Sequence, residues 1–86
     1  MNKLFIYEYI NKITKENIYN YGLNQGINLE KKDLDIIYYY VKNEYKRFFN
    51  NPEDILLEVK DKLSNNTYNK ILQLYNKYKN MLNYLK

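Results

Sequence analysis

Apolar residues recur at spacings of three and four along most of the chain, the spacing that places them on one face of a helix. Only one proline and two glycines interrupt the 86 residues. A strand would instead show apolar residues at every second position. The pattern therefore predicts an all-α protein.

Two short helices are expected in the N-terminal part of the chain. One face of the first carries Ile6, Tyr9, Ile10 and Ile13. Thr14 follows as an N-cap for the second helix, because its hydroxyl can accept a hydrogen bond from a backbone N–H of the first turn. Gly26 is suited to end this second helix, since glycine readily adopts the left-handed conformation found after helices.

The longest of the early helices is expected to begin near Glu30 or Lys31 and to end near Phe49. At about 100 degrees per residue, its main apolar positions fall within about 50 degrees of a common direction. These positions are Leu34, Ile37, Tyr38, Val41, Tyr45 and Phe48. Such a stripe is expected to face the core.

A fourth helix is expected from Pro52 to about Leu63. Asn51 can cap it, and proline suits the first helical position. Glu53 and Asp54 complement the positive end of the helix dipole. The apolar face of this helix comprises Ile55, Leu56, Val59 and Leu63.

The last helix is expected to run from about Asn66 or Thr67 almost to the end of the chain. Its apolar positions are Ile71, Leu74, Tyr75, Tyr78, Met81, Leu82 and Leu85. This stripe is wider than a single neighbouring helix covers. We therefore expect residues 1–86 to form one helical domain, a bundle of about four to five helices with its core built from the third and last.

Composition narrows the classes of function. Cysteine and histidine are absent, which removes disulfides and the common zinc ligands. No apolar run approaches the roughly 20 residues of a membrane span, and polar residues interrupt the N-terminal apolar patch before a signal peptide could form, so we expect a cytoplasmic protein. The net charge of +4 is compatible with a polyanionic partner without requiring one.

Residues that could perform catalysis are few. The serine and threonine hydroxyls belong to Thr14, Ser64 and Thr67, all at expected cap positions and without a histidine or cysteine to assist them. The carboxylates of Asp54, Glu58 and Asp61 spread along an exposed helical face and do not converge from a loop. We predict no enzymatic activity, no metal site and no cofactor.

The third predicted helix carries an unusual set of residues opposite its buried stripe, with Tyr40 on the flank of that side. This set, named here the basic aromatic face, comprises Lys32, Ile36, Tyr39, Tyr40, Asn43, Lys46 and Arg47. Tyrosine and arginine are enriched at protein interfaces, because they bury large areas and still satisfy their polar groups. The same residue types stack on bases and neutralise phosphates. The face is therefore a candidate surface for binding a partner, although tyrosine and lysine are also common in proteins encoded by AT-rich genomes.

The order of these features resembles a bacterial family. The matching segments are "ITKENIYNYGLNQGINLEKKDLDII", "FFNNPEDILLEVKDKL" and "NTYNKILQLYNKY". They resemble the small helical proteins of low-GC Gram-positive bacteria grouped as domain of unknown function 2624, over nearly the whole chain. The resemblance implies a helical fold, and it brings no catalytic residues, since none is established for that family.

These observations favour a non-enzymatic interaction module. It would bind another protein or form a homo-oligomer, through the basic aromatic face or the wide stripe of the last helix. Two alternatives remain open at this point. The helix, turn and helix of residues 14–41 have the outline of a nucleic-acid-binding helix-turn-helix protein, and a small phage-type inhibitor of a host enzyme fits the same size and composition.

Overall fold

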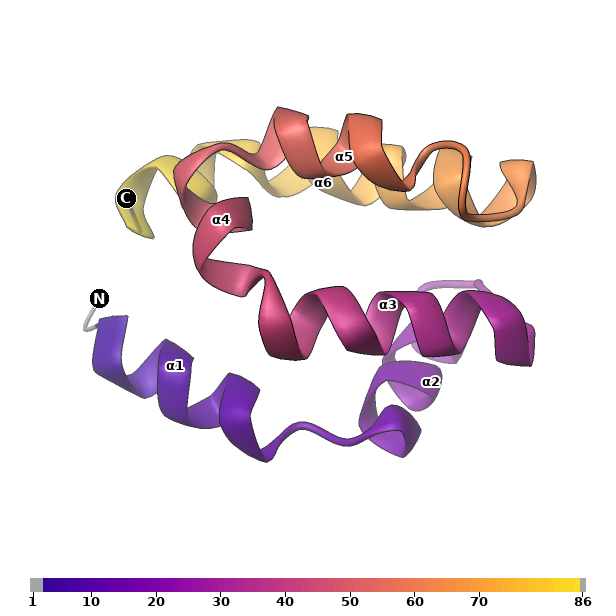
Figure 1. Ribbon diagram of the computed structural model, residues 1–86, viewed down its shortest axis with the longest axis horizontal. Helices are drawn as coiled ribbons and strands as arrows, with labels where there is room; N and C mark the ends of the chain where they lie inside the picture. Colours follow the sequence, from indigo (N-terminus) through magenta and orange to yellow (C-terminus); the bar gives the residue numbers. More distant parts are fainter. Residues whose placement is uncertain (1–2, 86) are drawn as a thin grey trace.

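The computed structural model describes the backbone of residues 3–85 and the side chains of residues 4–81. Within this part the chain forms six helices and no strand. The helices are α1 (Lys3–Lys12), α2 (Lys15–Asn24), α3 (Lys31–Asn43), α4 (Tyr45–Asn50), α5 (Pro52–Val59) and α6 (Asn65–Leu85) (Figure 1). The predicted all-α fold class is confirmed.

The predicted count of four to five helices is too low, because the third predicted helix is broken at Glu44. The backbone there has φ −123° and ψ 13°, outside the helical region. The break gives α4 a new direction and carries it toward α5 and α6 (Figure 1). Phe48 of α4 can then pack on the buried residues of α5 and against the ring of Tyr75 in α6, 6.4 Å away.

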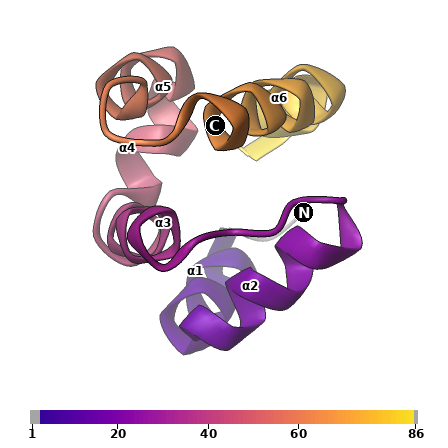
Figure 2. The same ribbon diagram turned by 90° about the vertical axis from the view of Figure 1, so that its right-hand side faces the viewer.

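The helices are arranged in two layers. One layer holds α1, α2 and α3, and the other holds α5 and α6, with α4 connecting them (Figures 1 and 2). Seen along the long axis, α3 lies below α5, while α2 lies below α6 (Figure 2). Two clusters of buried side chains hold the layers together.

The first cluster consists of Ile18, Ile27 and Leu29. Two of these residues lie in the loop after α2, which the helical pattern did not mark as buried. Gly26 has φ 80° and reverses the chain, as its position predicts. The N–H of Ile27 then donates to the carbonyl of Gly22 at 2.7 Å, so the loop folds back onto α2.

The second cluster consists of Ile55, Val59 and Leu63, with Leu56 also buried. The predicted apolar face of this segment is confirmed, but α5 ends at Val59 and not near Leu63. The N–H groups of Lys62 and Leu63 both donate to the carbonyl of Val59, which closes a turn and keeps Leu63 in the cluster.

Half-buried residues of α3 and α6 pack against both clusters. From these two helices, the first cluster is packed by Leu34, Ile37, Tyr38, Val41 and Leu74, and the second by Ile36, Ile37, Tyr40, Tyr68 and Ile71. The expectation that these two helices build the core is therefore only partly correct, since all the buried hydrophobic residues of the described part come from other segments. Within the described residues, no helix is both long enough and apolar enough to cross a membrane.

Candidate functional site

The residues of the basic aromatic face do not stay together on one exposed surface. Ile36 and Tyr40 are half-buried and pack on the cluster of Ile55, Val59 and Leu63. The residues that remain exposed are Lys32, Tyr39 and Asn43 on α3, and Lys46 and Arg47 on α4. The break at Glu44 separates these two groups, since the helices run in different directions.

Two of these residues are engaged with Glu58 of α5. The Tyr40 hydroxyl donates to one carboxylate oxygen at 2.7 Å, and the Arg47 guanidinium donates to the other at 2.9 Å. Arg47 also pairs with Glu44 at 3.3 Å. These contacts hold the pKa of Glu58 below its usual value, whereas burial and the bond to Glu58 raise the pKa of Tyr40 to about 12. The group therefore fastens α3 and α4 to α5.

Lys46 and Tyr39 make ring contacts. The Lys46 ammonium lies 5.4 Å from the ring centroid of Tyr7 in α1 and 5.9 Å from that of Tyr45, within the range of a cation–π interaction. Tyr39 meets Tyr40 edge-on at 5.5 Å and is otherwise exposed. Asn43 donates to the Tyr39 carbonyl at 3.0 Å, a local helix contact.

A polar cluster that the sequence did not reveal joins the starts of α3 and α6. Asp33 is only 1% exposed. Its carboxylate accepts hydrogen bonds from the hydroxyl of Ser64 at 2.6 Å, the hydroxyl of Thr67 at 2.7 Å and the N–H of Ser64 at 3.1 Å. The spacing of Ser64 and Thr67 before an apolar run is a recognisable helix start, but nothing in the sequence pairs it with Asp33.

This cluster has the residue types of a nucleophile and its base, but its electrostatics oppose that use. Burial alone would raise the pKa of Asp33, yet the hydrogen bonds from Ser64 and Thr67 outweigh burial and hold the pKa below its usual value. A carboxylate with a lowered pKa is a weak base and does not activate a hydroxyl. The cluster is suited to joining two helices.

Lys42 is a second residue that sequence reasoning missed. Its ammonium donates to three carbonyl groups at the end of α1: those of Ile10 at 3.2 Å, Asn11 at 2.6 Å and Ile13 at 3.2 Å. The end of a helix leaves its last carbonyls without i+4 partners. Ile10 and Asn11 belong to the last turn of α1, Ile13 follows it, and the Ile10 carbonyl also accepts from the N–H of Ile13 at 3.2 Å. Lys42 therefore caps α1 from α3.

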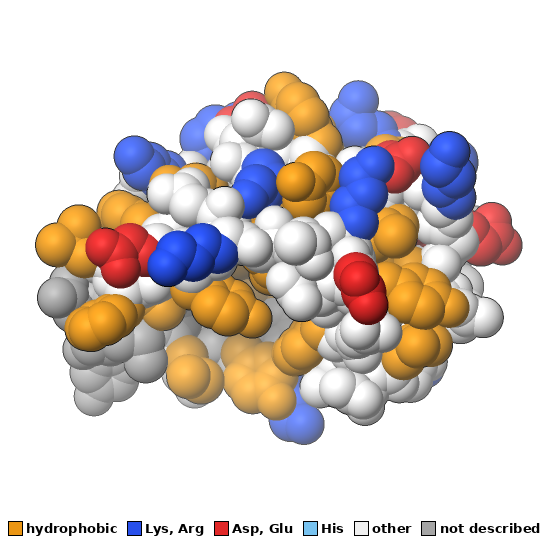
Figure 3. All heavy atoms as spheres, turned by 90° about the horizontal axis from the view of Figure 1, so that it is seen from below, with side chains coloured by type: hydrophobic (Ala, Val, Ile, Leu, Met, Phe, Trp, Pro, Cys, Tyr) orange, Lys and Arg blue, Asp and Glu red, His pale blue; other side chains and the backbone are white. Residues whose placement is uncertain are grey.

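An apolar groove lies between α1 and α2 on one side and α6 on the other. Its volume is about 400 Å³. It is named here the α6 groove, and its lining includes Tyr9, Ile13, Ile18, Tyr21, Ile71 and Leu74. Figure 3 shows a hollow ringed by hydrophobic side chains in the lower half of the view.

Large apolar side chains remain exposed around this groove. Tyr9 and Tyr21 line it and are 66% and 52% exposed. Tyr78 and Met81 lie four and seven residues after Leu74, on the same face of α6, and both are exposed. The wide stripe predicted for the last helix is thus only partly covered by the described part of the chain.

Comparisons with protein-family models, curated proteins and solved structures find no match to this chain. The resemblance to domain of unknown function 2624 stays a prediction from the sequence.

Proposed function

We propose that this chain is a non-enzymatic protein-interaction module, and that it binds another protein or a second copy of itself in the α6 groove. One observation carries the proposal: exposed Tyr9 and Tyr21 line an apolar groove, and the stripe of α6 that contributes Leu74 to it continues to exposed Tyr78 and Met81. Contiguous exposed apolar surface marks interaction sites, and tyrosine and methionine are enriched in interfaces. A cytoplasmic location and a phage-type inhibitory role are compatible with this proposal and stay predictions.

The contacts of the hydroxyl groups support a non-enzymatic role. Ser64 and Thr67 are both bonded to Asp33. The Thr14 hydroxyl accepts from the N–H of Asn17 at 3.1 Å, as the predicted N-cap of α2. Each hydroxyl that could serve as a nucleophile therefore stabilises a helix end or a helix junction.

The contacts also favour the α6 groove over the basic aromatic face. Tyr40 and Arg47 bind Glu58, and Ile36 packs inward, so these three residues already have partners within the chain. A nucleic acid bound there would have to compete with Glu58 for the Arg47 guanidinium. The nucleic-acid alternative predicts binding that weakens with salt, and substituting Lys46 and Arg47 by alanine should weaken that binding and flatten its salt dependence.

A matched pair of variants tests the proposal. Tyr21→Ser removes an aromatic ring at the α6 groove, and Tyr39→Ser removes one of equal exposure, 54% against 52%, on α3. We expect Tyr21→Ser to weaken the interaction about tenfold or more and Tyr39→Ser to leave it nearly unchanged. Light scattering measures self-association, and quantitative affinity capture from nuclease-treated lysate measures binding to other proteins.

The opposite ranking of the two variants would move the binding surface to α3. A chain that stays monomeric at high concentration and captures no protein would end the proposal. Circular dichroism and thermal unfolding of both variants serve as the folding control, since each substitution replaces a half-exposed side chain.

A further inference from the structure

A second cavity lies between α3, α4 and α5, on the other side of the wall formed by Ile37, Val41 and Ile71. Its volume is about 260 Å³. We propose that it binds a medium-chain carboxylate, with the hydrocarbon tail inside the cavity and the carboxylate beside Lys46. This inference does not depend on the proposed function, because it concerns a different site.

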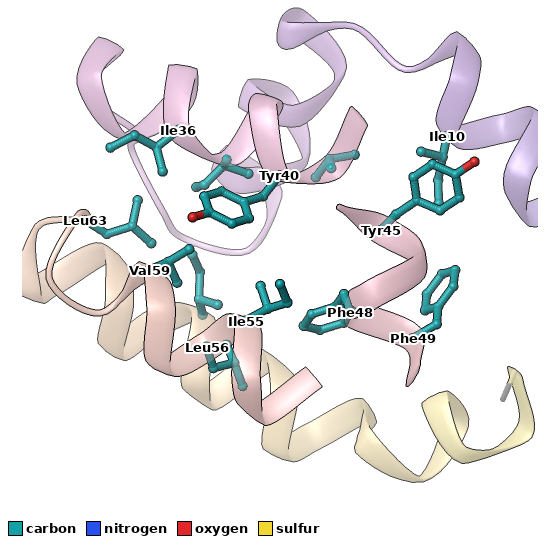
Figure 4. Close-up of a pocket in the computed structure, with 13 residues that line it drawn as sticks. Ile10, Ile36, Tyr40, Tyr45, Phe48, Phe49, Ile55, Leu56, Val59 and Leu63 are labelled. Atoms are coloured by element: carbon teal, nitrogen blue, oxygen red, sulfur yellow. The ribbon is translucent and has the colours of Figure 1, made fainter. Parts of the chain in front are cut away.

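The chemistry of the cavity wall selects the tail of the ligand. Figure 4 shows Ile36, Val59 and Leu63 at one end, Tyr45 and Phe49 at the other, and Ile55 beside Phe48 between them. Among the lining side chains only Tyr40 and Tyr45 carry a polar atom, and the Tyr40 hydroxyl is already bonded to Glu58. No buried side-chain nitrogen or oxygen of the described residues lacks a partner. The wall therefore favours a tail without polar atoms.

The volume sets the length of the tail. An apolar cavity of about 150 Å³ stays dry and binds benzene, which has about six heavy atoms. Scaled by volume, a cavity of about 260 Å³ has room for about ten heavy atoms. A saturated chain of about eight to ten carbons fits this space. Such a flexible chain can follow the irregular wall between three helices.

The charge at one end of the cavity selects the head group. Tyr45 lines the cavity, and the Lys46 ammonium lies 5.9 Å from the centroid of its ring and 5.4 Å from that of Tyr7, which is outside the cavity wall. Within the described residues Lys46 forms no ion pair with an acid, whereas Arg47 is paired with Glu44 and Glu58. The Lys46 ammonium, whose contacts with the described residues are to these aromatic rings, is therefore available to pair with an anion at this end of the cavity. A carboxylate is expected to bind better than an alcohol or an amine of equal length.

Titration calorimetry and chemical-shift mapping with pure ligands test the inference. The probes are octanoate and decanoate, with decanol and decylamine as neutral and cationic counterparts of the longer chain. We expect one site per chain, an affinity for decanoate about fifteenfold above that for octanoate, or about fourfold per added methylene, and weaker binding of decylamine. The shift changes should centre on Val59, Phe48 and Tyr45.

Two variants test the head-group position and the tail cavity separately. Lys46→Gln should reduce the preference for decanoate over decanol, while Lys60→Gln, an exposed lysine of the chain that does not line the cavity, should not. Val59→Phe fills the cavity and should abolish binding of both ligands. If that variant does not fold, the Lys46→Gln result still decides the head group.

The inference is overturned by the absence of saturable binding to the wild type, by equal affinity for decanoate and decylamine, or by shift changes that centre on the α6 groove. Tyr21→Ser identifies binding in the α6 groove, since Tyr21 lines only that groove and the variant should then weaken binding of the ligand. A failure here leaves the proposed protein interaction intact, and a failure of that interaction leaves this site intact.

Discussion

At the scale of single residues, Asp33 is the polar side chain on which the fold depends most. Its buried carboxylate accepts three hydrogen bonds from Ser64 and Thr67 and so joins the first turn of α3 to the start of α6. Both helix N-termini also favour a negative charge. A residue of this type would ordinarily be assigned to the surface, where an isolated aspartate belongs.

Asp33→Asn should destabilise the protein by about 1 to 3 kcal/mol, because the neutral amide replaces a charged acceptor and leaves a donor facing the hydroxyls. Asp35→Asn is the matched control. Asp35 lies on the same helix and forms an exposed ion pair with Lys15 at 2.8 Å, which contributes little. Urea unfolding followed by circular dichroism measures both, and an equal loss in the two variants would contradict the role given to Asp33.

Asp33 also predicts a pH dependence. Its pKa in the folded protein is lowered, so the unfolded chain takes up the proton first as the pH falls. The contribution of Asp33 to the free energy of unfolding is therefore complete above about pH 4 and is lost as the pH falls below it. The free energies of unfolding of the wild type and of Asp33→Asn should therefore converge as the pH falls from 6 to 2. A constant difference between the two proteins over this range would refute the prediction.

Tyr40 gives the opposite pH dependence. Its pKa in the folded protein is about 12, so stability contributed by Tyr40 is complete below about pH 10 and is lost above it as the unfolded chain ionises. Glu58→Gln should bring the pKa of Tyr40 back toward 10, because it removes the negative charge that the phenol faces. Glu53→Gln, on the same helix, is the control. Carbon-13 NMR of the tyrosine ring measures the pKa, and an unchanged value in Glu58→Gln would show that burial alone raises it.

At the scale of the helices, Lys42 holds α1 in place. It is the side chain that donates to three carbonyls at the end of that helix. Lys42→Met keeps the apolar stem and removes the donors, so α1 should fray and the free energy of unfolding should fall by about 1 to 3 kcal/mol.

Hydrogen exchange resolves this effect by helix. Amide protection should fall in α1 and remain nearly unchanged in α5. Lys32→Met, an exposed position on α3, should have little effect. A uniform loss of protection across all helices would mean that Lys42 contributes to the whole fold and not to α1 in particular.

Much of the helical structure can be predicted from sequence because local signals agree there. Thr14 caps α2, Gly26 takes the left-handed conformation, and Pro52 begins α5, each as the residue type indicates. The break at Glu44 has no such signal, since glutamate is a good helix former. The break follows from tertiary packing, which turns Phe48 toward α5.

The candidate surfaces were harder to predict, because helical periodicity describes one helix at a time. Ile36 lies opposite the stripe of α3 and Tyr40 lies on the flank, yet both pack against the cluster of Ile55, Val59 and Leu63. Asp33 and Ser64 are 31 residues apart, and only the fold brings them together. The wide stripe of the last helix leaves Tyr78 and Met81 exposed, and its role in binding stays a prediction.

At the scale of the whole molecule, the two layers create both proposed sites. In these layers α3 lies below α5 and α2 lies below α6 (Figure 2), and the wall of Ile37, Val41 and Ile71 separates the α6 groove from the cavity around Val59. In a chain of 86 residues the core is modest, so occupation of either site would also stabilise the fold.

Site-specific photo-crosslinking in cells of the source organism tests the proposed interaction most directly. The photoreactive amino acid p-benzoylphenylalanine replaces Tyr21 at the α6 groove in one experiment and Tyr39 on α3 in the other. Protein adducts, to a second copy or to another protein, should form from position 21 and not from position 39. Adducts from position 39 alone, or adducts to nucleic acid, would contradict the assignment of the α6 groove as the interaction surface.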